Sequence, residues 1–212
     1  MRFALLKRKV LNAGALGISY VKLIPDLLKL GKKSLVIDCG ANVGHITKLF
    51  ARTGAAVISF EPDPLAFKLL YKRCGRNKNV TLIQKGVWNQ NTTLQLYTHK
   101  EAAGEEASFT VGSSIVADKI NIDLSKAQSI EVIDLVAFMQ QQNRKINLVK
   151  LDVEGAEIEI LKHIIAAKAW HLFERMYVET HETKIPSQVK ELEYIKAQLK
   201  DNGISHIKLN WI

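Results

Sequence analysis

The chain has 212 residues, 47% of them hydrophobic, and a formal net charge of +9. No stretch rich in proline, glycine or serine is long enough to be a linker, so we expect one globular domain with a sizeable core. Lysines interrupt the apolar stretches near the N-terminus, which excludes the run of about 20 apolar residues that a transmembrane helix needs. Cys39 and Cys74 are the only cysteines and cannot build a disulfide framework, so we expect a cytoplasmic location.

The positive charge is concentrated near the N-terminus. Residues 34–212 hold 22 basic and 20 acidic residues, which argues against a nucleic-acid surface over the whole domain. We therefore expect a basic helical N-terminal extension, residues 1–33, followed by a domain of residues 34–212. A solvated helical cap is the favoured interpretation of the extension, and peripheral contact with a membrane or an anionic partner is the alternative. The extension carries one acid, Asp26, and eight basic residues: Arg2, Lys7, Arg8, Lys9, Lys22, Lys29, Lys32 and Lys33.

Strand-like apolar runs alternate with helical patterns from residue 34 onward, which predicts an α/β fold with a mostly parallel central sheet and helices on both faces. Asp63 and Pro64 form an N-cap and a first-turn proline, which predict a helix start. Residues 86–133 break the alternation and are predicted to be an insertion with strands at 94–98 and 129–133. The other expected strands are 34–39, 56–60, 80–85, 147–153, 173–180 and 205–209, and the expected helices are 41–52, 64–74, 134–142, 156–168 and 187–202.

The first expected strand ends in a D-x-G-x-x-x-G turn that runs from Asp38 to Gly44. Gly40 allows a tight turn against a ligand, and Gly44 allows helix and strand to approach closely. A dinucleotide fingerprint would need glycine at Asn42, so this turn does not predict a pyrophosphate site. Glu61 follows the second expected strand, about 20 residues later, where a carboxylate can accept both ribose hydroxyls. The combination favours an adenosine-containing ligand without a pyrophosphate, and adenosylmethionine fits.

Four motifs, DCGANVGHIT, SFEPDP, KLDVEGAEIEIL and YVETH, resemble in order those of the FkbM family of methyltransferases. The resemblance covers roughly residues 34–181. It implies a Rossmann-like class I methyltransferase fold, S-adenosylmethionine as methyl donor, and transfer to oxygen, frequently a sugar hydroxyl of a glycan or glycosylated metabolite. The residues that it assigns to the cofactor are Asp38, Gly40, Ala41, Asn42 and Gly44 in the first motif, Glu61 and Pro62 at the ribose, and Gly86 and Val87 at the adenine.

Charged residues occur where a central parallel strand is normally apolar. Lys150, Asp152 and Glu154 alternate along one expected strand and should share a face. Glu179 and His181 share a face at the end of the next strand. Because ligands bind at the carboxyl edge of open α/β sheets, we expect these five side chains to form the reaction centre. The alternative is structural, with Glu154 serving the following helix and Lys150 as its ion-pair partner.

Methyl transfer from a sulfonium to a hydroxyl needs alignment of the acceptor and removal of its proton. We expect Asp152 to lie nearest the sulfonium, Glu154 or His181 to act as the base, and Lys150 to orient the carboxylates. The same carboxylates and imidazole could instead hold Mg²⁺, which would lower the pKa of the acceptor hydroxyl.

The insertion should supply much of the acceptor pocket, with Ser113 and Ser114 as candidate contacts to acceptor hydroxyls. Two other functions remain open at this level. A nucleic-acid methyltransferase would use the basic extension and the six basic residues between Lys68 and Lys85. A non-catalytic binding module would keep the fold, although the intact Asp152, Glu154 and His181 argue against it.

Overall fold

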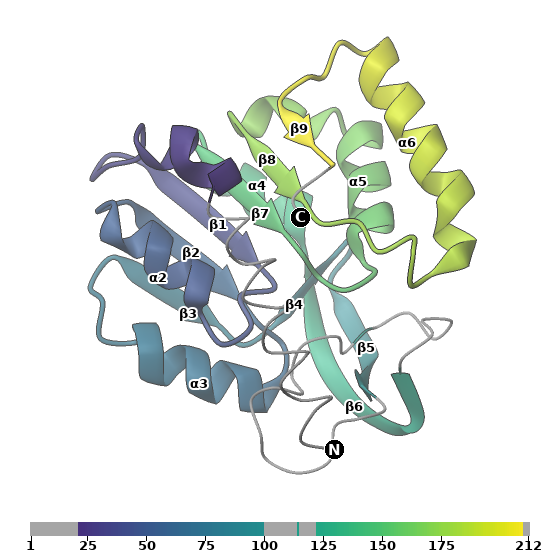
Figure 1. Cartoon of the computed structure of the whole chain (residues 1–212), viewed down its shortest axis with the longest axis horizontal. Coiled ribbons are helices and arrows are strands. Elements are labelled where there is room, and N and C mark those ends of the chain that lie inside the picture. Colours follow the sequence, from purple (N-terminus) through teal and green to yellow (C-terminus); the bar gives the residue numbers. More distant parts are fainter. Residues whose placement is uncertain (1–20, 100–113, 115–121, 210–212) are drawn as a thin grey trace.

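The computed structural model describes residues 21–99, 114 and 122–209 of the chain. Its centre is a six-stranded sheet in the order β3-β2-β1-β7-β8-β9, in which every neighbouring pair is parallel (Figure 1). The strands are β1 (Leu35–Cys39), β2 (Ala56–Phe60), β3 (Val80–Ile83), β7 (Leu148–Leu151), β8 (Met176–Val178) and β9 (Ile207–Lys208). The predicted α/β architecture with a parallel sheet is confirmed.

Helices cover both faces of this sheet. On one face, Val36 and Leu148 of the sheet pack with Leu23 and with Phe50 of α2 (His45–Arg52), and α3 (Pro64–Cys74) lies on the same side. On the other face, Ile37 and its neighbours pack against α4 (Leu135–Gln140), α5 (Glu157–Ala166) and α6 (Val189–Asp201). Side chains at alternate positions of the strands thus pack into two separate cores, one on each face, as expected for parallel strands buried on both faces.

The predicted insertion forms a sheet of its own. Its strands are β4 (Gly86–Trp88), β5 (Thr92–His99) and β6 (Ile122–Asp134), in the order β4-β6-β5. β4 runs parallel and β5 antiparallel to β6. In Figure 1 this small sheet lies beyond the ends of β1 and β7, the edge where the predicted site residues gather.

The described part of the N-terminal extension packs on the main sheet. Residues 21–27 are helical, and Leu23 is fully buried. Tyr177 of β8 donates its hydroxyl to the Asp26 carboxylate at 2.8 Å, and Arg175 lies 3.4 Å from the same carboxylate. These contacts attach Asp26 to β8 and to Arg175 before it, whereas residues 1–20 of the expected extension lie outside the described part. Across the described residues, no helix is both long and apolar enough to cross a membrane.

Several expected boundaries are wrong. β6 begins at Ile122 rather than at residue 129, and β8 spans Met176–Val178 rather than residues 173–180. Two further differences lie at the carboxyl edge of the sheet. The helix expected from residue 41 begins at His45, because Gly40, Asn42 and Gly44 all have positive φ angles, of 75°, 48° and 84°. The strand expected to reach residue 153 ends at Leu151. Irregular backbone therefore replaces regular structure where the motifs lie.

Candidate functional site

The glycine turn and the Lys150 strand meet at the point where the strand order of the sheet reverses. β1 lies between β2 and β7, so connections leave its two sides in opposite directions, and the carboxyl edge at such a point is where open α/β sheets generally bind ligands. Gly40 lies at this edge, and a Cβ built on it would lie 1.7 Å from the backbone oxygen of Asp152. The backbone segments that directly follow β1 and β7 therefore approach each other as only glycine allows.

Gly40→Ala should lower the free energy of unfolding by more than about 2 kcal/mol, because the substitution combines a left-handed backbone angle with a backbone clash. Gly203→Ala, with φ +66° and open space, isolates the cost of the backbone angle. Gly31→Ala, with no positive φ and nothing within 4 Å, should be neutral or mildly stabilising. Urea denaturation of the three variants measures these differences. Equal losses for Gly40→Ala and Gly203→Ala would mean that the close approach costs nothing.

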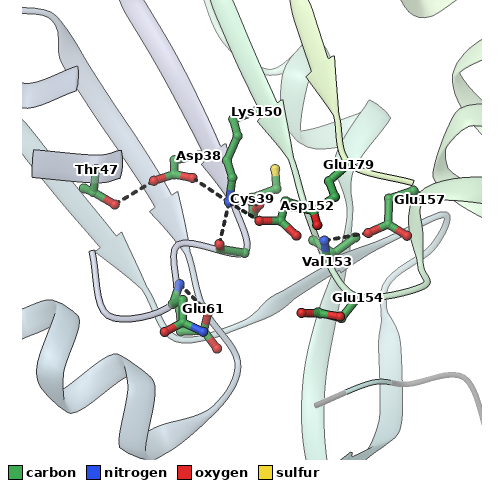
Figure 2. A network of polar contacts seen from close by, with 12 residues as sticks. Asp38, Cys39, Thr47, Glu61, Lys150, Asp152, Val153, Glu154, Glu157 and Glu179 are labelled. Atoms are coloured by element: carbon green, nitrogen blue, oxygen red, sulfur yellow. Dashed lines mark hydrogen bonds and ion pairs between the residues drawn. The ribbon is translucent and has the colours of Figure 1, made fainter. Parts of the chain in front are cut away.

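Glu61 lies directly after β2 and is nearly completely buried. Its Oε2 accepts the backbone N–H of Asn42 at 2.7 Å, and its Oε1 accepts the backbone N–H of Asp63 at 2.9 Å. Burial raises the pKa of Glu61 to about 7, against the opposing effect of these two donors. One carboxylate thus connects the glycine turn to the end of β2, at the edge where a ribose is expected (Figure 2).

A buried polar row crosses three neighbouring strands. Lys150 on β7 is in register with Asp38 on β1, which is in register with Ser59 on β2. The Lys150 ammonium lies 3.6 Å from Asp38 Oδ1 and donates to the Gly40 carbonyl oxygen at 2.7 Å. Thr47 of α2 donates its hydroxyl to Asp38 Oδ2 at 2.6 Å. The row therefore fixes the glycine turn through Lys150, and Figure 2 shows the dashed contacts that run from Thr47 through Asp38 to Lys150 and on to the turn.

Lys150 also reaches the predicted reaction centre. Its ammonium lies 3.0 Å from Asp152 Oδ2. Burial alone would lower the pKa of Lys150, but the carboxylates of Asp152 and Asp38 hold it above the ordinary value, so the ammonium stays charged. Burial raises the pKa of Asp38, with Lys150 opposing that shift. The structure thus brings Lys150 to Asp152, as expected, and gives Asp38 no exposed surface.

His181 lies at the centre of the acidic cluster. Its Nε2 atom is 3.2 Å from Glu154 Oε2, 3.7 Å from Glu179 Oε1 and 4.0 Å from Asp152 Oδ1. None of these contacts has hydrogen-bond geometry, and Nε2 has no other hydrogen-bond partner among the described residues. Burial lowers the pKa of His181, but the surrounding carboxylates more than offset burial and raise it to about 9. The five predicted residues therefore converge on one place.

Glu154 was expected to join the cluster by lying on the same strand face as Lys150 and Asp152, and this expectation is wrong. Glu154 does not follow Lys150 along a strand, because β7 ends at Leu151. It lies in a turn with φ 57°, and Gly155 follows with φ 117°. The turn, rather than the strand pleat, sets the direction of the Glu154 side chain, and the turn backbone adopts angles that are uncommon for residues other than glycine.

Three buried polar residues of the site were not predicted: Thr47, Ser59 and Glu157. Glu157 accepts the backbone N–H groups of Val153 and Gly155, each at 2.8 Å, and makes a 3.1 Å hydrogen bond with His181 Nδ1. The second acid of the E-G-A-E sequence was a visible signal for Glu157. Thr47, nine residues after Asp38, carries no such signal, because its contact depends on how α2 packs on the sheet.

Three side chains of the cluster have the spacing of a metal site, but their other contacts do not suit a metal ion. Asp152, Glu157 and His181 each offer one ligand atom, and these atoms lie within 4.8 Å of one another. Both Glu157 oxygens, however, already accept backbone N–H groups, and Asp152 is paired with the Lys150 ammonium. Mg²⁺ prefers six oxygen ligands, so an imidazole and two engaged carboxylates do not fit it well.

The remaining predicted residues lie around this centre. A Cβ on Gly86 would lie 3.7 Å from Pro62 Cβ, so the start of β4 is next to the Glu61 segment. Val87, the next residue of β4, is buried. Ala41 is also buried, directly after Gly40. Ser114 is buried and donates its hydroxyl to the backbone oxygen of Glu154 at 2.6 Å, which links the insertion to the Glu154 turn. Ser113 lies outside the described residues.

Curated proteins similar to this chain are methyltransferases. Methyltransferase sdnD of Sordaria araneosa is 27% identical over 88% of this chain and 80% of its own length. Methyltransferase 1 of Beauveria bassiana is 24% identical over 75% and 69%, respectively. The solved structure of methyltransferase FkbM from Methylobacillus flagellatus is 15% identical, with a TM-score of 0.48, over 79% of this chain and 38% of that chain.

The family comparison covers the whole site. Residues 38–204 match the model of the methyltransferase FkbM domain, a span that includes the glycine turn, Glu61, the insertion and both ends of the acidic cluster. The predicted class I methyltransferase fold and the predicted enzyme class agree with this match. The chain belongs to the FkbM family of methyltransferases.

Proposed function

We propose that the chain transfers the methyl group of S-adenosylmethionine to a hydroxyl of a sugar, in a glycan or glycosylated metabolite. The observation that carries this proposal is the convergence of Asp152, Glu154 and Glu179 on Nε2 of His181. Carboxylates are good acceptors for sugar hydroxyls, and an imidazole can take the proton that the transferred methyl group replaces. The FkbM resemblance supports the same substrate class.

The cofactor fits the edge between the glycine turn and Glu61. We infer that the amino-acid end of adenosylmethionine lies at Gly40 to Gly44, with the ribose on Glu61 and the adenine near Gly86 and Val87. The two N–H groups that hold Glu61 leave lone pairs on both carboxylate oxygens for ribose hydroxyls. Asp38 acts through Lys150 and the turn, since it has no exposed surface.

The chemical step is an in-line displacement at the methyl carbon. The acceptor oxygen forms the new C–O bond, and the C–S bond breaks with its electron pair staying on sulfur. The hydroxyl proton goes to His181 Nε2, and the products are a methyl ether and adenosylhomocysteine. Asp152, held by Lys150, faces the positive sulfonium and positions it for attack, and the sulfonium charge disappears during the transfer.

Cofactor affinity should depend on Glu61 and on pH. Glu61→Ala should weaken adenosylhomocysteine binding by roughly 1.5 to 3 kcal/mol, the scale for hydrogen bonds to a charged group. Because the ionised carboxylate is the acceptor and its pKa is about 7, binding at pH 6 should be about tenfold weaker than at pH 8. Calorimetry measures both effects. Glu61→Gln should bind adenosylhomocysteine weakly, with an affinity that does not change with pH. If this variant kept the pH dependence of the unmutated chain, Glu61 would have no part in the binding step.

The insertion should govern the acceptor. Because Ser114 holds the Glu154 turn, replacing Ser113 and Ser114 by alanine should raise the acceptor KM at least about threefold, with cofactor affinity unchanged. Ser129→Ala, on the exposed side of β6, is the matched control and should change neither constant. A loss of cofactor affinity with a normal acceptor KM would assign the serines to the cofactor instead.

The proposed substrate class can be tested with methyl-labelled adenosylmethionine and separate pools of glycans, nucleotide sugars, small metabolites and RNA. Label should enter a sugar-containing pool as a methyl ether. Label in RNA would favour the nucleic-acid alternative. Cofactor binding without label in any pool would favour a binding module.

Metal dependence belongs to the same test. We propose a metal-free reaction, because Glu157 and Asp152 are already engaged. A chelator should therefore leave the labelling rate unchanged. Loss of activity that added Mg²⁺ restores would instead support the alternative in which a metal activates the hydroxyl.

We also propose a reducing, cytoplasmic environment, since Cys39 and Cys74 are both unpaired and buried.

A further inference from the structure

Glu157 is a buried acid that the FkbM resemblance did not assign. It is the first residue of α5, and its side chain is 0% exposed. A carboxylate removed from solvent is costly unless donors satisfy it. Glu157 has three: Val153 N–H and Gly155 N–H at 2.8 Å, and His181 Nδ1 at 3.1 Å. These donors explain how Glu157 is tolerated in the core but not what it does there.

Helix stabilisation does not account for this burial. An acid in the first turn of a helix interacts favourably with the helix dipole, and the interaction works at an exposed position. Glu159 lies in the same first turn of α5 with its side chain 40% exposed. The helix therefore already has an acid in this turn that needs no desolvation, and the burial of Glu157 calls for another explanation.

The partners of Glu157 belong to both halves of the acidic cluster. Its two backbone donors flank Glu154 in the turn after β7, and its third donor is the ring of His181 after β8. With Nδ1 held by Glu157, His181 directs its other ring nitrogen, Nε2, to Glu154 at 3.2 Å. The identity of the atom that a histidine offers to a substrate is set by the bond that its other nitrogen makes.

We propose that Glu157 is the positioning residue of the reaction centre: it fixes the ring of His181 through Nδ1 and fixes the Glu154 turn through Val153 and Gly155, so that Nε2 and the carboxylates meet at one acceptor hydroxyl. This inference rests on the proposed role of His181 as base. Glu157 itself stays behind the histidine and touches neither cofactor nor acceptor.

Gln188 provides a matched control, because it supports the same turn without touching His181. Its side-chain amide donates to the Gly155 carbonyl oxygen at 2.6 Å, and Gln188 is nearly as buried as Glu157. A residue that merely holds the turn should behave like Gln188. A residue that positions the histidine should affect the ring of His181 as well.

The test uses the whole chain with bound adenosylhomocysteine, ¹⁵N-labelled histidine, and the variants Glu157→Leu, Glu157→Gln and Gln188→Leu. In the unmutated chain, the Nδ1 proton of His181 should be protected from exchange, and His181→Gln assigns its resonance. Glu157→Leu should lose this protection, and Glu157→Gln, which keeps one acceptor oxygen, should recover part of it. Gln188→Leu should retain it.

Kinetics with labelled adenosylmethionine complete the test. Glu157→Leu should lower kcat between about tenfold and 10,000-fold, up to the full contribution of a general base. Glu157→Gln should lie between it and the unmutated chain, and cofactor affinity should stay within about threefold. An unchanged Nδ1 resonance in Glu157→Leu would overturn the proposal, as would an equal loss of kcat in Gln188→Leu. If Glu157→Leu does not fold, Glu157→Gln decides by the same two readouts. The resonance does not require turnover, so it separates this inference from the substrate proposal.

Discussion

His181→Gln should lower the rate of methyl transfer by about 100- to 10,000-fold, the usual cost of removing a general base. The cofactor should still bind, because His181 contacts Glu157 and Glu154, which follow β7, whereas the proposed cofactor residues lie in the glycine turn after β1 and in the Glu61 segment after β2. Asp152→Asn and Glu154→Gln should each also reduce transfer, since both carboxylates lie within 4.0 Å of Nε2. Single-turnover kinetics with saturating cofactor measure the effect on the chemical step.

The pH dependence identifies the base. His181 must be neutral to accept a proton, and its pKa is about 9. The rate in the unmutated chain should therefore rise about tenfold per pH unit below 9 and then level off. His163→Gln is the control, because His163 also contacts a carboxylate, Asp134 at 3.1 Å, but lies outside the cluster. A plateau that begins in the acid range would transfer the role of base to Glu154.

The raised pKa of His181 also predicts that the stability of the fold falls with pH over the range in which the rate of methyl transfer rises. A histidine whose pKa rises from 6.5 to about 9 on folding stabilises the fold fully below pH 6.5. That stabilisation is lost as the pH rises through 9. The unmutated chain should therefore lose stability between pH 6.5 and 9, where activity rises, and His181→Gln should lose less.

Lys150→Met should lower the free energy of unfolding by roughly 3 to 5 kcal/mol, because it leaves Asp38 buried without its charge partner. The loss should shrink at low pH, where Asp38 becomes protonated and no longer needs the ammonium. Denaturant unfolding at two pH values measures both effects. Lys150→Met should also impair cofactor binding, since Lys150 holds the Gly40 carbonyl oxygen.

Two further variants make this test specific. Lys162 also contacts two carboxylates, Glu159 and Glu191, but on the surface, so Lys162→Met should cost at most about 1 kcal/mol. The double variant Asp38→Leu with Lys150→Met should recover part of the lost stability, because it removes both charges. Equal losses for Lys150→Met and Lys162→Met would contradict a buried ion pair at the glycine turn.

Sequence patterns predicted the elements whose signals are local. The second strand was predicted at its observed bounds, 56–60, because its five apolar or small residues lie between clear turn signals. The helix after Asp63 was predicted because a carboxylate N-cap and a proline start it, and Asp63 indeed accepts the N–H groups of Leu65 and Ala66. Such signals depend on a few neighbouring residues and need no knowledge of the fold.

The five residues of the predicted reaction centre lie together in the structure, but part of the geometry that brings them together was not predicted. Alternation along a strand predicted that Lys150 and Asp152 share a face, and the two side chains do form an ion pair, although β7 ends at Leu151. Glu154 broke the alternation, because its left-handed backbone angle belongs to a turn that Glu157 holds locally and Gln188 holds by a long-range contact. Periodicity cannot detect such a turn. The role of Glu157 likewise depends on His181, 24 residues away in the chain.

Calorimetric titration of the whole chain with adenosylhomocysteine and with NAD tests most directly whether the edge between the glycine turn and Glu61 binds the methyl donor. We predict that adenosylhomocysteine binds at one site, that Glu61→Ala weakens this binding, and that NAD gives no heat above dilution, because Asn42 replaces the glycine that a pyrophosphate requires. Tight binding of NAD, with no response to adenosylhomocysteine, would contradict the account.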